Sequence, residues 1–124
     1  MQELDELAGL YERVDSLPSK DLDKLPHGTI QLDASGKILN FNRYESELSN
    51  LSATEVIGKN FFREVAPCTN VQEFFGRFQA GVKAKQLFVK FRYHFAFKQN
   101  PRNVLVTLFY SAQSDSVWVF VQPM

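Results

Sequence analysis

The chain of 124 residues is long enough for one domain with one core and too short for two. Its residues are 44% hydrophobic and 14% aromatic, with 12 Phe, which excludes an intrinsically disordered chain. Lys and Arg number 14 and Asp and Glu number 14, so no net charge favours nucleic acid or anionic membranes, and no apolar run reaches the roughly 20 residues of a membrane helix. With one cysteine, no internal disulfide is possible, and an acidic N-terminus lacks the layout of a secretion signal, so we expect a cytoplasmic protein.

The first 27 residues are expected to form a helical cap. Apolar residues recur at helical spacing from Leu4 to Leu17, which predicts an amphipathic helix that Pro18 ends. A short helical turn over residues 21–25 is expected to follow. These residues could cover a sheet or be loosely attached, and the pattern does not decide between the two.

A β-hairpin is predicted from Gly28 onward. The stretches GTIQLD and KILNFN flank the turn ASG, in which Gly36 supplies the positive φ that such turns favour. Three short helices are predicted next, each from a polar residue followed three positions later by glutamate, the spacing of a capping box. The three pairs are Asn42 and Glu45, Ser52 and Glu55, and Asn70 and Glu73. The third pair opens the longest predicted helix, whose apolar face comprises Val71, Phe74, Phe75, Phe78 and Val82.

The C-terminal third is predicted to be all strand. Every odd position from Leu87 to Phe97 is apolar, as in a strand with one wet face. A turn over residues 100–103 leads to VLVTLFYS, and a turn over residues 113–115 leads to SVWVFVQ. This order of elements predicts an α+β domain over residues 28–124, with one antiparallel sheet and helices on one face, the arrangement of a PAS domain. The fold by itself leaves the function open.

The segment IGKNFFREVAPCTN, from Ile57 to Asn70, resembles the chromophore-attachment region of the photoactive yellow protein family. The stretches GTIQLDASGKILNFN and SVWVFV match the same pattern, so the resemblance runs from about Gly28 to the C-terminus. It implies that Cys68 carries p-coumaric (4-hydroxycinnamic) acid as a thioester. It also implies that Glu45, protonated, donates a hydrogen bond to the chromophore phenolate, and that Ser49 is the neighbouring hydroxyl.

The resemblance implies a chromophore pocket in which several residues depart from the family pattern. Phe41 stands where a tyrosine usually donates to the phenolate, and Leu51 stands where an arginine often covers the ring. Of the aromatic and the methionine above the chromophore, Phe95 keeps the aromatic and Gln99 replaces the methionine. The other implied pocket residues are Ile30, Phe61, Val65, Ala66, Pro67 and Thr69.

The same residues have simpler interpretations when the resemblance is set aside. A lone cysteine among aromatics is usually a buried small hydrophobe. Glu45 could reach back to the N–H of Asn42 and complete a capping box. Ser49 could be an ordinary helix-end serine. In the chromophore interpretation, burial and a nearby phenolate raise the pKa of Glu45, and only the protonated carboxyl donates.

We therefore expect a blue-light photoreceptor in which chromophore isomerisation and proton transfer from Glu45 change the binding of a downstream signalling protein, which the sequence does not identify. The alternative is a PAS module without a chromophore that serves in interaction or dimerisation. A flavin or haem sensor is disfavoured because the chain has no Asn-Cys-Arg and no CxxCH motif. No acid–base set or metal-ligand spacing is recognisable, so we expect a monomeric protein that is not an enzyme, does not bind nucleic acid and does not insert into membranes.

Overall fold

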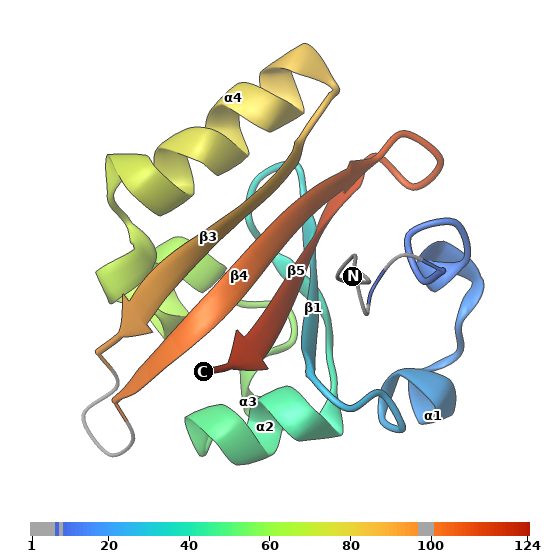
Figure 1. The fold of residues 1–124 in the computed structure, drawn as a ribbon, viewed down its shortest axis with the longest axis vertical. Helices are drawn as coiled ribbons and strands as arrows, with labels where there is room; N and C mark the ends of the chain where they lie inside the picture. Colours follow the sequence, from blue (N-terminus) through green and yellow to red (C-terminus); the bar gives the residue numbers. More distant parts are fainter. Residues whose placement is uncertain (1–6, 8, 97–100) are drawn as a thin grey trace, which may run out of the picture.

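The computed structural model describes residues 7, 9–96 and 101–124 (Figure 1). One antiparallel sheet of five strands, in the order β2-β1-β5-β4-β3, forms its centre. The strands are β1 (Gly28–Asp33), β2 (Ile38–Phe41), β3 (Phe88–Phe95), β4 (Arg102–Ser111) and β5 (Ser116–Pro123). This confirms the predicted α+β architecture with a single antiparallel sheet.

The β1–β2 hairpin forms where the turn chemistry predicts it. The Asp33 carboxylate accepts hydrogen bonds from the backbone N–H groups of Ser35 and Lys37, both at 2.9 Å. Gly36 takes φ +93°, a conformation that L side chains rarely adopt. The hairpin sets Ile30 opposite Phe41 and thereby fixes the edge of the sheet next to the following helix.

Both faces of the sheet are covered at β5, whose side chains alternate between two cores. Val117, Val119 and Val121 belong to the larger core, which the helices cover. Trp118 and Phe120 alternate with them and pack against residues of the N-terminal segment on the opposite face. The helices are α1 (Ser19–Leu22), α2 (Arg43–Ser49), α3 (Ala53–Val56) and α4 (Arg77–Ala84), with shorter turns η1 (Val14–Ser16), η2 (Phe61–Val65), η3 (Pro67–Thr69) and η4 (Gln72–Gly76).

The amphipathic helix predicted for the N-terminal segment is wrong where the structure describes it. Residues 9–13 form turns, η1 is a single 3₁₀ turn, and α1 begins directly after Pro18 rather than at residue 21. A short helix is only marginally stable without tertiary contacts. In this segment the side chain of Asp15 in η1 makes such contacts with β4, β5 and the turn between them. It accepts hydrogen bonds from Ser114 Oγ and Trp118 Nε1, both at 2.8 Å, and from Ser111. Leu4 lies outside the described residues.

Two of the three predicted helix starts are observed. Asn42 caps α2 by accepting a hydrogen bond from the backbone of Glu45, and Ser52 begins α3 with a complete capping box. The start at Asn70 is wrong, because Asn70 instead donates its backbone N–H to the carbonyl of Pro67 and ends η3. The chain then reaches α4 through the π-helical turn η4. Val71, placed on the apolar face of the predicted helix, precedes η4 and is 43% exposed.

The three-strand meander agrees with its prediction. Along β3 the odd positions face the helices, with Phe95 buried, while Lys90, Arg92 and His94 are exposed. The β3–β4 register pairs Phe95 with Arg102, which places this arginine beside the C-terminal end of β3. The predicted strand extended to Phe97, which lies outside the described residues.

Candidate functional site

Cys68 lies in the short 3₁₀ turn η3, between the π-helical turns η2 and η4. The hydroxyl of Thr69 donates to the carbonyl of Ala66 at 2.6 Å and closes the turn, and both of these residues are buried. Cys68 itself is half-buried and packs against the main core. Cys68 therefore lies at the border between the core and the surface.

Tyr93 on β3 holds the backbone of Cys68, a contact that sequence reasoning did not identify. Its hydroxyl donates to the Cys68 carbonyl. Burial, together with the neighbouring groups Cys68 and Glu73, raises the pKa of Tyr93 to about 12. The phenol therefore stays protonated near neutral pH and remains a donor. Its position two residues before Phe95, on the same face of the strand, was the available signal.

Glu45 on α2 is a buried carboxyl, with 3% of its surface exposed. Its Oε1 atom is buried without a hydrogen-bond partner. Burial raises the pKa of Glu45 from 4.5 to about 8, so the neutral acid predominates at pH 7. The carboxyl lies against Gly28, where an added Cβ would come within 2.0 Å of Oε1. Gly28 thus provides the space in which the carboxyl is desolvated.

The capping interpretation of Glu45 does not hold for its side chain. Asn42 Oδ1 accepts from the backbone N–H groups of Glu45 at 3.0 Å and Thr29 at 2.9 Å. In a capping box the Glu45 carboxyl would accept a hydrogen bond from the backbone N–H of Asn42. That N–H donates instead to the backbone carbonyl of Thr29 at 3.0 Å. The helix cap is complete without the Glu45 carboxyl, so another explanation for its burial is needed.

A small cavity of about 10 Å³ lies next to Glu45. A volume of this size is at the lower limit for one water molecule. Ser49, 4% exposed, borders the cavity. Its hydroxyl donates to the backbone carbonyl of Glu45 at 2.8 Å, so its single hydrogen is already engaged. The lining residues are Glu45, Leu48, Ser49, Phe95, Arg102, Val104 and Val121.

A strip of aromatic side chains connects the cavity with the Cys68 turn. The rings of Tyr93 and Phe95 have centroids 5.6 Å apart, and Phe74 lies 5.2 Å from the first and 6.1 Å from the second. Tyr93 contacts Cys68 at one end, and Phe95 lines the Glu45 cavity at the other. The fold therefore brings a lone cysteine and a buried acid to the two ends of one aromatic surface.

Comparison with known proteins identifies the family. Residues 18–124 match the model of the PAS fold. Photoactive yellow protein of Halochromatium salexigens is 44% identical over 107 residues, which are 86% of this chain and 86% of that protein. Photoactive yellow protein of Rhodothalassium salexigens is 45% identical over 101 residues, 82% of this chain and 81% of that protein. The chain belongs to the photoactive yellow protein family.

Solved structures agree with this assignment. The photoactive yellow protein domain of the sensor histidine kinase Ppr from Rhodospirillum centenum superimposes with a TM-score of 0.86 at 41% identity, covering 90% of this chain and 98% of that one. The PAS domain of the RpfR receptor from Cronobacter turicensis has a TM-score of 0.67 at 18% identity, covering 82% and 96%, which shows a shared fold only.

The remaining residues implied by the family pattern differ in their surroundings. Ile30 and Phe61 are fully buried core residues, whereas Leu51 and Val65 are half-buried against the same core. Pro67 is exposed at the start of η3, and Ala66 and Thr69 on either side of Pro67 and Cys68 are buried. Gln99 lies outside the described residues.

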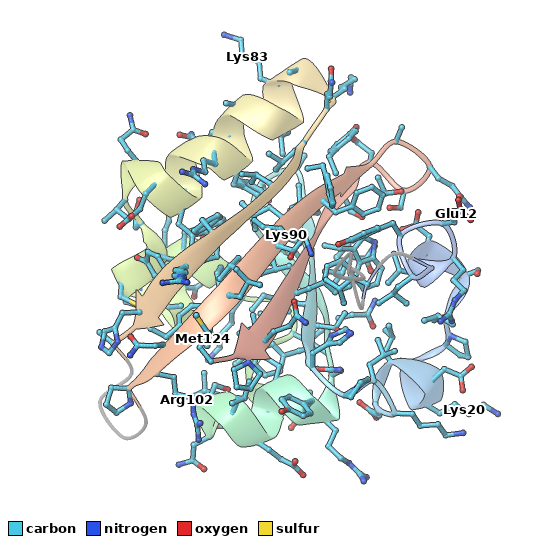
Figure 2. All side chains as sticks on the ribbon, viewed as in Figure 1. Glu12, Lys20, Lys83, Lys90, Arg102 and Met124 are labelled. Carbon is cyan, nitrogen blue, oxygen red and sulfur yellow. The ribbon has the colours of Figure 1, made fainter. Side chains whose placement is uncertain are left out.

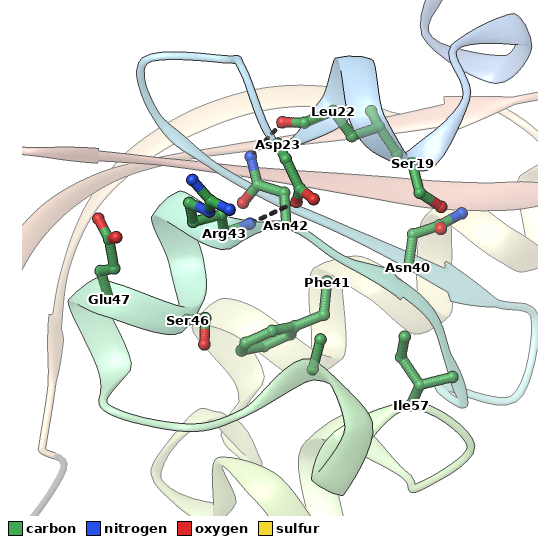
Figure 3. A pocket seen from close by; sticks show the side chains of 11 residues that line it. Ser19, Leu22, Asp23, Asn40, Phe41, Asn42, Arg43, Ser46, Glu47 and Ile57 are labelled. Atoms are coloured by element: carbon green, nitrogen blue, oxygen red, sulfur yellow. Dashed lines mark hydrogen bonds between the residues drawn. The ribbon is translucent and has the colours of Figure 1, made fainter.

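Phe41 borders a different hollow from the one at Glu45. Phe41 lines a surface hollow of about 430 Å³ between α1, β2, α2 and α3, and Figure 3 shows the side chains around it. This hollow shares no lining residue with the Glu45 cavity. Its walls are tied together by hydrogen bonds of 2.8 Å from Asn42 Nδ2 to the Leu22 carbonyl and from the Arg43 backbone to Asp23. The ring is 6% exposed and has no polar atom to offer an anion.

The described residues give no support to two other kinds of site. No three His, Cys, Asp or Glu side chains among them are grouped closely enough to hold a metal ion. Within the same ranges, no helix combines the length and apolarity needed to cross a membrane.

Proposed function

We propose that this chain is a blue-light photoreceptor that carries a p-hydroxycinnamyl group as a thioester on Cys68. Its relatives are named photoactive yellow proteins, and Cys68 is its one cysteine. The observation that carries the proposal is the buried Glu45 Oε1, which has no partner and lies at the far end of the aromatic strip from Cys68. Acylation would join Sγ to the carbonyl carbon of an activated acid, and the activating group would leave with the thiol proton.

The residues present suit such a group chemically. A protonated carboxyl is a hydrogen-bond donor, and burial keeps Glu45 in this form at pH 7. The cavity beside it is far smaller than a cinnamyl group, so uptake would require the side chains around Phe95 to move apart. The bound group would supply absorption of visible light and isomerisation of its double bond.

Glu45 would convert this event into a change of the domain. It would hold its proton in the dark and give it up to the phenolate oxygen of the bound group after illumination, which would leave a carboxylate in a site without a partner for Oε1. An unpaired buried charge is unfavourable by several kcal/mol, so the domain would loosen around α2 and alter the binding of a signalling protein. The related domain in Rhodospirillum centenum belongs to a sensor histidine kinase, and we infer a signalling partner rather than an enzymatic activity for this chain.

The test is reconstitution of the ligand-free protein with activated p-hydroxycinnamate. The wild type should gain a covalent adduct and a visible absorption band, whereas Cys68→Ser should gain neither. Circular dichroism of both proteins before loading controls for folding. A colourless wild type would favour a PAS interaction module instead, and a Cys68→Ser protein with the adduct and the colour would refute the attachment site.

A further inference from the structure

Arg102 lies between the interior cavity and the surface. Together with Glu45 and Ser49 it lines the small cavity. It also lines a surface hollow of about 400 Å³, whose other residues are Tyr44, Glu47, Leu48 and Pro123. The side chain is half-buried at the start of β4, where Figure 2 labels it near α2. It therefore forms part of the wall that separates Glu45 from solvent.

A hydrogen bond holds the arginine in this position. Arg102 Nε donates to the carbonyl of Leu48 at 3.3 Å, near the C-terminal end of α2. A guanidinium has five N–H donors in a rigid plane, and this bond uses one of them. Among the described residues Arg102 has no ion pair.

The charge of Arg102 is not balanced inside the cavity. Glu45 is the one acidic residue of the lining, and its burial keeps it neutral at pH 7. Glu47 is the acidic residue of the outer hollow and is exposed to solvent, which screens it. An anion entering the cavity would thus meet a neutral donor in Glu45 and a single cation in Arg102.

We propose that Arg102 closes the Glu45 cavity toward solvent and supplies the positive charge that stabilises the anionic end of the bound group. This inference rests on the proposed function, because a phenolate is the anion that a cinnamyl thioester on Cys68 would bring to the cavity. Arg102 would stabilise the negative charge of the bound group and would take no part in its attachment to Cys68.

The first test is a dark pH titration of the visible band in the loaded protein. Arg102→Gln keeps an N–H donor and removes the charge, so the midpoint of phenolate protonation should rise by about one pH unit, a tenfold change. Arg102→Lys keeps the charge and should stay within a few tenths of a unit of the wild type. Arg92→Gln, the same charge change at an exposed position on β3, should leave the midpoint unchanged. Equal shifts in Arg102→Gln and Arg102→Lys would show that the hydrogen bond to Leu48 matters rather than the charge.

A second measurement does not depend on colour. In the ligand-free protein labelled with ¹⁵N, the Nε–H of Arg102 should exchange more slowly than that of Arg92, because it is hydrogen-bonded in the cavity wall. Its resonance should shift when Cys68 is loaded, and that of Arg92 should not. A coloured protein with an unchanged Arg102 resonance and an unchanged midpoint would overturn this inference alone. A wild type that takes up no chromophore would overturn the proposed function and the charge role with it.

Discussion

Glu45→Gln should change how the stability of the ligand-free protein depends on pH. Burial raises the pKa of Glu45 from 4.5 to about 8, so the folded chain holds this proton more tightly than the unfolded chain. The contribution of Glu45 to stability is therefore largest below about pH 4.5, falls as the pH rises toward 8, and levels off above it. Each pH unit in this window reduces the free energy of unfolding by about 1.4 kcal/mol, or about 5 kcal/mol across the whole window.

The assay is urea unfolding at intervals between pH 5 and pH 8. Trp118 is the only tryptophan and is buried, so its fluorescence follows unfolding of the sheet. Over this range the wild type should lose about 3–4 kcal/mol more stability than Glu45→Gln, in which nothing titrates at position 45. Glu47→Gln, on the exposed side of α2, controls for the change in net charge and should follow the wild type.

The predicted difference is a large fraction of the total, since a domain of this size has about 5–15 kcal/mol of stability. It should therefore be measurable well above the error of the extrapolation. Parallel pH profiles for the wild type and Glu45→Gln would refute the reasoning. They would mean that the carboxyl reaches water or finds a partner in the folded chain, and Glu45 would then not be a neutral donor at pH 7.

Three further substitutions test other parts of the site. Gly28→Ala places a Cβ 2.0 Å from Glu45 Oε1, so urea unfolding at pH 5 should show a loss of about 1–3 kcal/mol, and unchanged stability would contradict the placement of the carboxyl. Asp15→Ala removes the carboxylate that accepts hydrogen bonds from Trp118 Nε1 and from two serine hydroxyls. The free energy of unfolding should fall by about 1–3 kcal/mol, and the Trp118 emission should change. An unaltered emission would show that the contact is absent in solution. In the loaded protein, Phe41→Tyr should lower the midpoint of the dark pH titration if Phe41 occupies the second donor position of the family, whereas an equal midpoint would favour its placement in the surface hollow.

The elements that could be predicted from the sequence are those specified by local pattern. A turn with a glycine that needs positive φ predicts the β1–β2 hairpin, and a two-residue alternation of apolar side chains predicts the strands of the meander. The N-terminal segment has an equally regular pattern, and its buried leucines do contact the sheet. There the hydrogen bonds of Asp15 to a hairpin about a hundred residues away in the sequence favour turns over a helix. Helical periodicity predicts which side chains are buried, but it contains no information on a hydrogen bond between residues so far apart in the sequence.

The residues of the site also fall into those that the sequence predicts and those that it does not. Cys68 stands out because it is the chain's one cysteine, and the family pattern places Glu45 opposite it. The local spacing of Asn42 and Glu45 fits a capping box just as well. The capping box is ruled out because the backbone N–H of Asn42 donates to the carbonyl of Thr29 on β1. Tyr93 and Arg102 could not be assigned from their own neighbourhoods, because their partners lie 25 and 54 residues away in the sequence.

The burial that gives Glu45 its proposed role also limits the size of the response. If Glu45 ionises while still buried, any rearrangement that hydrates it gains up to about 5 kcal/mol, so only changes smaller than this can follow. A domain has about 5–15 kcal/mol of stability, so this gain reaches only the lower end of that range, which favours a local change over global unfolding. The element closest to the charge is α2, a helix of seven residues. Its N-cap Asn42 is hydrogen-bonded to Leu22 at the end of α1, and its first residue Arg43 to Asp23. Its last turn is hydrogen-bonded to Arg102 on β4. Loosening α2 would therefore act on both faces of the sheet at once, through bonds that are each worth about 1 kcal/mol.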